Sequence, residues 1–115
     1  MTPPVTCTSL EEVRTHIDRI DRQLVALLAE RGAYVKQAAA FKKTADDVKA
    51  PRRVEQVIEK VTSLAGELGA NVRVVERVYR ALVGAFIDAE LEEHAARGDA
   101  ELEEHAALGD DAPKP

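Results

Sequence analysis

The chain has 115 residues, of which 45% are hydrophobic, and its net charge is −5; this size and composition are typical of one globular domain. Nine of the 21 acidic residues but only two of the 16 basic ones lie in residues 89–115, and there is no tryptophan. The other residues, 1–88, carry 14 basic and 12 acidic residues, a net charge of only +2. The chain therefore lacks the basic surface and the stacking aromatic side chains of a nucleic-acid-binding protein.

Other classes of function are excluded by what the sequence lacks. The one cysteine, Cys7, allows no intrachain disulfide. No apolar run approaches the roughly 18 residues of a membrane-spanning helix, and no signal peptide is recognisable. The three histidines, His16, His94 and His105, show no metal-ligand spacing. We therefore expect a cytoplasmic protein with no metal, no cofactor and no membrane or nucleic-acid partner.

The longest regular pattern predicts a helix from Ser9 to Lys43, after an extended lead-in over residues 1–8. Ser9 and Glu12 form the capping-box pair at its start. Apolar residues then recur at steps of three and four, as on one buried face of a helix. We call this face the seam; it consists of Leu10, Val13, Ile17, Ile20, Leu24, Leu27, Tyr34, Ala38 and Phe41.

The seam contains one charged residue, Arg31, at the heptad position between Leu24 and Ala38. A buried guanidinium without a partner is very costly in free energy. Arg31 therefore either extends to water or pairs with a carboxylate, which belongs to the protein or to a bound anionic ligand. Lys42 follows eleven residues later, about 16 Å along nearly the same helix face. It is either a solvated lysine favoured at a helix C-terminus or a second cation for the same small dianion.

The length of this helix predicts a dimer or a higher assembly. At about 50 Å, the helix is too long for a compact monomer of this size to cover. Arg14 and Arg31 are about 25 Å apart along it and do not reach one small molecule from the same chain. If two copies of the helix run antiparallel, Arg14 of one chain approaches the middle of its partner.

Two more helices are predicted after a short polar connection over residues 44–50. The second helix covers residues 51–68, with proline at a favoured first position and Gly69 as a left-handed cap. Arg52 and Arg53 lie in its first turn, where the helix dipole disfavours cations. These two arginines therefore either face solvent or are held there by an anion.

The third helix is predicted to begin after Asn71, a suitable cap. Glu90 continues its apolar face, which includes Tyr79, Leu82 and Phe86. A carboxylate on such a face is desolvated unless a cation offsets its charge. The alternative is that the helix leaves the body of the protein at Glu90, since carboxylates are mostly exposed.

The C-terminal part contains a tandem repeat. Residues 89–99 and 100–110 are identical except at one position, and each copy ends in a Gly-Asp pair. We expect residues 9–96 to form the helical domain. Residues 97–115 are predicted to be an acidic tail, frayed or disordered because its glycines interrupt the helix. Nothing in the tail indicates a chemical role.

Three segments carry a resemblance to a known family. They are LEEVRTHIDRIDRQLVALLAERGAYVKQAAAFK, the arginine-bearing APRRV, and VYRALVGAFIDAE. Together they resemble the all-helical chorismate mutase family over roughly residues 10–90. CTSLEEVR, YVKQAAAFK and APRRV are most similar to the isochorismate-pyruvate lyase branch, which makes salicylate and pyruvate. The resemblance implies an all-α fold of three helices with one very long N-terminal helix, in an intertwined homodimer.

The resemblance also implies a role for each candidate residue. Each of two equivalent sites takes Arg31, Lys42 and Arg53 from one chain and Arg14 from the other to bind a small dicarboxylate. Arg14 and Arg31 hold its carboxylates, while Lys42 hydrogen-bonds the ether oxygen. Glu90 stands where many members have glutamine and donates to the same oxygen, which requires its protonated form. Activity is therefore expected to rise toward acidic pH.

The function predicted first is chorismate mutase, which rearranges chorismate to prephenate by preorganisation and electrostatic stabilisation. The first alternative is isochorismate-pyruvate lyase, because Val54 and Ala50 replace acids that many mutases carry. A helical interaction module is an alternative from another class; it accounts for the seam but not for Arg31 together with an inward Glu90. The last alternative is a weakly active regulator of another shikimate-pathway enzyme.

Overall fold

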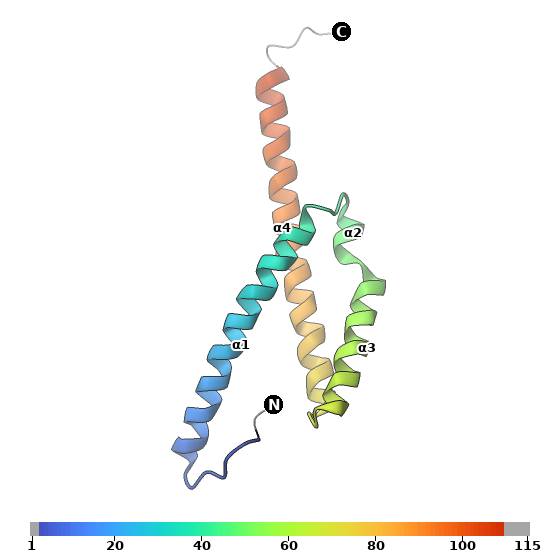
Figure 1. Ribbon diagram of the computed structural model, residues 1–115. Coiled ribbons are helices and arrows are strands. Elements are labelled where there is room, and N and C mark those ends of the chain that lie inside the picture. The colour runs from blue at the N-terminus through green and yellow to red at the C-terminus, as the bar shows by residue number, and fades with distance from the viewer. Residues whose placement is uncertain (1–2, 110–115) are drawn as a thin grey trace. The chain divides into compact units, whose positions relative to one another are not determined.

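The computed structural model describes the backbone of residues 3–109 and the side chains of residues 3–97. All regular structure in this part of the chain is helical, which confirms the predicted all-α class (Figure 1). The helices are α1 (Leu10–Ala39), α2 (Ala45–Lys49), α3 (Pro51–Glu67) and α4 (Val72–Gly109). The chain divides into two compact units, residues 1–37 and residues 38–115.

The start of α1 follows from local hydrogen bonds. The Glu12 backbone N–H donates to the Ser9 hydroxyl at 3.1 Å, as a capping box requires. The Glu12 carboxylate accepts from the backbone N–H of Thr8 at 2.8 Å and from the Thr8 hydroxyl at 3.0 Å. In a capping box the partner would be the backbone N–H of Ser9, one residue later. These bonds to Thr8 lower the pKa of Glu12 below its ordinary value.

The seam of α1 is exposed in the single chain. Leu10, Leu24 and Tyr34 are 61%, 50% and 65% exposed, and Ala39 is the one buried residue of this helix among the described side chains. So large an apolar stripe is unusual on the surface of a soluble monomer. The intertwined homodimer, which would cover the seam, stays a prediction.

The end of α1 corrects the sequence-based boundary at Lys43. The helix ends at Ala39, and the next residues form a tighter turn in which Phe41 and Lys42 donate to the carbonyls of Ala38 and Ala39. Such three-residue bonds are common where a helix runs out of partners. Lys42 therefore lies outside α1, and its predicted position on the helix face of Arg31 is wrong.

The predicted polar connection over residues 44–50 contains the short helix α2 (Ala45–Lys49). Thr44 caps it by accepting from the Asp47 N–H at 3.1 Å. The Asp47 carboxylate accepts in return from the backbone N–H groups of Lys43 at 3.1 Å and Thr44 at 3.2 Å. These bonds lower the pKa of Asp47, and the bond from Lys43 has the largest effect. Val48 is only 2% exposed and anchors α2, which packs against α4.

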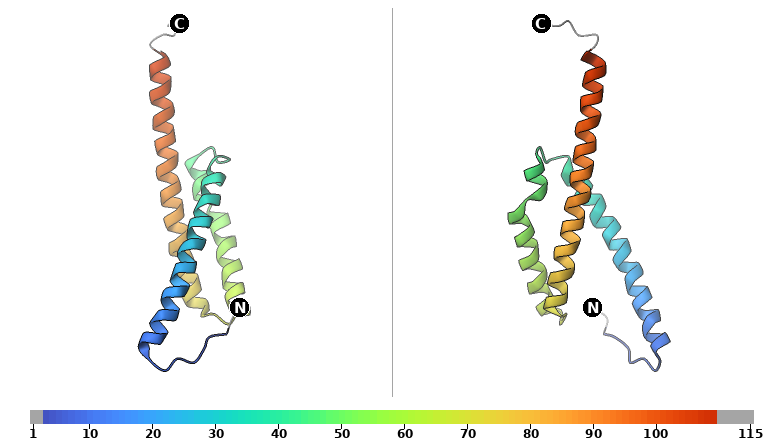
Figure 2. Two further views of the ribbon diagram at one scale, coloured as in Figure 1. Left: turned by 60° about the vertical axis from the view of Figure 1, so that its left-hand side comes forward. Right: turned by 180° about the vertical axis from the view of Figure 1, so that it is seen from behind.

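α3 and α4 form a helical hairpin whose ends match the sequence pattern closely. Gly69 has a φ of 70° in the turn, and Asn71 accepts from the Val74 N–H at 3.1 Å. The two helices lie side by side in both views of Figure 2 and pack against each other. Their contact forms the apolar core of this unit around buried Ile58, Ala65 and Val83.

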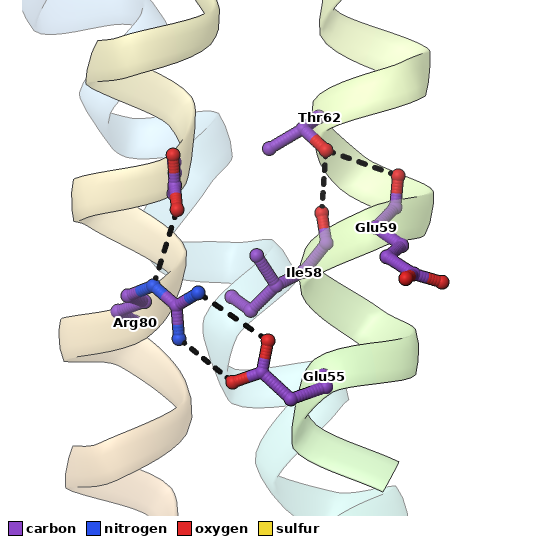
Figure 3. A network of polar contacts seen from close by, with 6 residues as sticks. Glu55, Ile58, Glu59, Thr62 and Arg80 are labelled. Carbon is purple, nitrogen blue, oxygen red and sulfur yellow. Dashed lines mark hydrogen bonds and ion pairs between the residues drawn. The ribbon is translucent and has the colours of Figure 1, made fainter. Parts of the chain in front are cut away.

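An ion-pair cluster on the rim of the hairpin was not predicted from the sequence (Figure 3). Arg80 of α4 donates to both oxygens of Glu55 on α3, at 3.0 and 3.4 Å, and its Nε donates to Glu76 at 3.3 Å. The Arg80 guanidinium lowers the pKa of Glu55, and the same contacts raise that of Arg80. The cluster ties the two helices together at a solvent-exposed edge.

α4 continues as a helix through Gly98 to Gly109, so the expected interruption at Gly98 does not occur. A glycine costs only about 1 kcal/mol in a helix interior, which flanking alanine, leucine and glutamate residues offset. Residues 110–115 of the predicted tail lie outside the described residues. The boundary between domain and tail stays a prediction.

Candidate active site

Lys42 and Glu90, both candidates from the sequence, contact each other directly. The Lys42 Nζ lies 2.8 Å from Glu90 Oε1 and donates to Glu90 Oε2 at 3.1 Å. The Glu90 side chain is 4% exposed, whereas that of Lys42 is 27% exposed. The cation that Glu90 needs on an inward helix face is thus supplied by a residue 48 positions earlier in the chain.

Three local features place these two side chains. Glu90 lies on α4, and the helical period puts it on the face of buried Val83, seven residues or two turns earlier. Lys42 lies in the turn between Ala39 and the Thr44 cap. Because α2 packs on α4, the preceding turn is held close enough for the lysine to reach across.

The pair leaves hydrogen-bonding capacity for a ligand. Glu90 Oε1 is close to the ammonium but makes no bond of hydrogen-bond geometry with any described residue. An ammonium has three N–H donors, and the bond to Oε2 uses one of them. The partial exposure of Lys42 makes its other donors reachable from solvent, so this is a place where an anionic or ether oxygen can bind.

Arg53 lies in the same unit, in the first turn of α3, and is exposed. α3 has no side-chain cap: its N-cap residue is Ala50, whose φ of 34° lies in the left-handed region. The first turn of α3 therefore presents free N–H groups near Arg53, which favours an anion. Val54 beside it is half-buried and offers no hydrogen bond to a substrate hydroxyl.

Arg14 and Arg31 belong to α1 and to the other compact unit. Arg14 is exposed, and Arg31 is half-buried. Within one helix their separation of seventeen residues keeps them about 25 Å apart. Their convergence with Lys42, Arg53 and Glu90 on one substrate stays a prediction.

Sequence reasoning missed two features that position the candidate residues. One is the Thr44–Asp47 capping box, which fixes the backbone just after Lys42. Its signal is a threonine followed three residues later by an acid, here Asp in place of the commoner Glu. The other is the Glu55–Arg80 pair between α3 and α4, whose residues are 25 positions apart and carry no local signal.

The described part of the chain has neither a metal-ligating cluster nor a membrane-spanning helix. No group of three or more His, Cys, Asp or Glu side chains there is arranged to hold a metal ion. None of its helices combines the length and the apolar character needed to cross a bilayer.

Comparison with known families identifies the fold. A family model described as chorismate mutase type II matches residues 13–91, which include all five candidate residues and more than half of the chain. The chain belongs to the chorismate mutase type II family. The resemblance drawn from the three sequence segments is thereby confirmed, with almost the same boundaries.

Two named relatives indicate the activities found among similar proteins. An isochorismate pyruvate lyase of Pseudomonas aeruginosa is 33% identical over 92 residues, which cover 80% of this chain and 91% of that protein. A bifunctional chorismate mutase/prephenate dehydratase of Aquifex aeolicus is 31% identical over 85 residues, which cover 70% of this chain but 24% of that protein. The similarity to members with different names leaves the reaction of this chain to be argued from its site.

Proposed function

We propose that the protein is a chorismate mutase, which converts chorismate to prephenate. Its membership of the chorismate mutase type II family supports this proposal, and the observation that carries it is the Lys42–Glu90 pair. That pair presents a partly exposed ammonium beside a buried carboxyl group. The ammonium suits an ether oxygen that gains negative charge as its bond to carbon breaks.

The proposed reaction is a Claisen rearrangement and needs no covalent catalysis. The enolpyruvyl side chain of chorismate folds over the ring, and the ether carbon–oxygen bond breaks as a new carbon–carbon bond forms. All atoms stay in the product. The protein contributes by holding the reactive conformation and by stabilising charge on the ether oxygen, for which Lys42 is the donor.

Arginines hold the two substrate carboxylates in this proposal. Arg31 and Arg53 come from one chain and Arg14 from its partner, so the active enzyme is a homodimer. The exposed seam of α1 supports this assembly, because a second copy would cover its apolar side chains. A guanidinium binds a carboxylate through two parallel hydrogen bonds, which fixes the orientation of the substrate.

Isochorismate-pyruvate lyase is the second candidate function. The similarity over most of both chains to a protein with that name favours it, and so does Val54, which gives no polar contact to a ring hydroxyl. In this reaction a hydrogen moves from the ring to the enolpyruvyl group as the ether bond breaks, which releases pyruvate and leaves salicylate. The same residues would bind the substrate.

The test is to incubate the protein with chorismate and, separately, with isochorismate, and to follow prephenate and salicylate. Prephenate without salicylate supports the mutase. Salicylate formed with the higher kcat/KM supports the lyase. If neither product forms, a helical interaction module is favoured instead. Lys42→Met should lower kcat by about a hundredfold or more, whereas Glu92→Gln, at an exposed position of α4, should leave it unchanged.

A further inference from the structure

The Lys42–Glu90 pair joins a rigid element to a segment that is not helical. Glu90 lies in the middle of α4. Lys42 belongs to residues 40–44, which connect α1 to α2 and which we call the strap. Several contacts hold the region of the strap. They include buried Val48 in the following helix, the bonds of the Lys43 and Thr44 N–H groups to Asp47, and the ion pair from Lys42 to Glu90.

We propose that Glu90 is a positioning residue for Lys42, which holds the ammonium and the strap in place before a substrate arrives. The proposal rests on the proposed function in one respect only, namely that Lys42 acts on the substrate. As a carboxylate, Glu90 accepts a hydrogen bond from Lys42 and does not donate one. In this state Lys42 alone of the two donates to the substrate, so Glu90 acts through Lys42.

The flexibility of lysine is the physical reason for such a role. A lysine carries its charge on a four-carbon stem with many rotamers, and a side chain 27% exposed has water as a competing partner. Helix α4 fixes the position of Glu90, and its burial at 4% exposure makes the carboxylate dependent on the ammonium. A group fixed on a helix thus orders a flexible side chain on a segment that is not helical.

The geometry also allows Lys42 to bind a substrate without leaving Glu90. The ammonium lies near both carboxylate oxygens, at 2.8 and 3.1 Å, but makes a hydrogen bond to Oε2 only. Its remaining donors can bond to an ether or carboxylate oxygen of the substrate. The ion pair therefore orients the catalytic ammonium and need not break for the reaction to begin.

Amide hydrogen exchange in the absence of substrate tests the positioning role. The reporters are the N–H groups of Phe41 and Lys42, which donate to backbone carbonyls, and that of Thr44, which donates to Asp47. Glu90→Gln keeps the shape of the side chain but removes its charge. Its weaker bond to the ammonium should raise exchange at these amides about tenfold, relative to the Leu68 and Ala70 amides of the α3–α4 turn.

A double-variant cycle separates positioning from a general loss of stability. Lys42→Gln should raise strap exchange as much as Glu90→Gln does, and the double variant should add nothing further, because both remove one interaction. Lys42→Gln leaves the buried Glu90 carboxylate without its cation, whereas the double variant contains no unpaired buried charge. If Lys42→Gln does not fold, the double variant is compared with Glu90→Gln alone, and the two should show equal strap exchange. Glu92→Gln removes the same charge from an exposed position of α4 and should leave exchange unchanged. Additive effects, or unchanged strap exchange in Glu90→Gln, would overturn the proposal.

Steady-state kinetics give a readout that a merely structural role would not move. If Glu90 positions Lys42, chorismate must order the strap itself in Glu90→Gln, and KM should rise several-fold while the reference variant Glu92→Gln keeps its KM. An unchanged KM would remove the positioning role even if exchange had become faster. Absence of turnover in the unmodified protein would count against the proposed function alone, since the exchange experiment needs no substrate.

Discussion

The exposed seam of α1 supports the most decisive prediction about this protein, which is the effect of Leu24→Asp. Leu24 lies near the middle of the seam and is 50% exposed in the single chain. If the seam faces water, an aspartate there is an ordinary surface substitution. If a second chain covers the seam, the aspartate places a carboxylate in an apolar contact, once in each chain of a symmetric dimer.

The size of the effect follows from the exposure of the leucine. Burying a leucine side chain fully contributes about 1.5–3 kcal/mol, so covering the exposed half of Leu24 contributes about 1 kcal/mol in each chain. Desolvation of the new carboxylate adds several kcal/mol for each ion that stays buried. Over two chains, a loss of at least about 4 kcal/mol is expected, which raises the dimer Kd about a thousandfold.

Sedimentation velocity over a wide range of protein concentration is the direct assay, with circular dichroism to follow helix content. The unmodified protein should sediment as a dimer, and Leu24→Asp should dissociate or lose helix content at the same concentration. Ala29→Asp is the matched control: it introduces the same residue at an exposed position, on the α1 face opposite the seam. Its dimer should persist, with a stability change within about 1 kcal/mol.

Two outcomes would contradict a buried seam. If Leu24→Asp kept the mass of the unmodified protein and its stability changed no more than in Ala29→Asp, the seam would not be an interface. A protein that sediments as a folded monomer before any substitution would lead to the same conclusion. Arg14 of a second chain would then have no route to the candidate site, and the proposed active site would need another source of positive charge.

Three further predictions concern the second compact unit. Ile58 is 4% exposed, so Ile58→Ala should cost about 2–5 kcal/mol in urea unfolding and Ile58→Val about 0.5–1.5 kcal/mol; equal losses would contradict this view of the core. Because Arg80 holds the pKa of Glu55 below its ordinary value of 4.5, the ion pair stabilises the protein above that pH and is lost as pH falls through the lower value. The stability deficit of Glu55→Gln should therefore be largest near neutral pH and vanish in acid, whereas a pH-independent deficit would refute the role of the charge. The left-handed conformation of Ala50 costs about 1–2 kcal/mol, which glycine would not pay, although glycine loses about 0.5–1 kcal/mol more chain entropy on folding. Ala50→Gly should therefore raise the free energy of unfolding by about 0.5 kcal/mol. A lower urea midpoint for this variant would contradict the presence of strain at Ala50.

Local interactions explain why much of the fold could be read from the sequence. The cap at Ser9 and Glu12, the left-handed Gly69 and the cap at Asn71 each depend on residues within a few positions, and each is found close to where it was predicted. The helical period places Glu90 on the apolar face of its helix, and its burial decides against the alternative that the helix leaves the body there. The ends of α1 and α2 were harder, because the short capping box at Thr44 competes with continuation of the first helix.

The residue pattern alone indicates that the chain is helical, that it resembles the chorismate mutase family, and that Glu90 continues the apolar face of its helix. These properties depend on the local order of residues and their periodicity. Helix packing buries Glu90 and selects the cation that meets it, which is Lys42 from a turn 48 residues away. It likewise paired Glu55 with Arg80 across the α3–α4 hairpin. Such partners are chosen by how helices pack, because a long, flexible cation can reach many acids until packing brings one of them within a few ångströms.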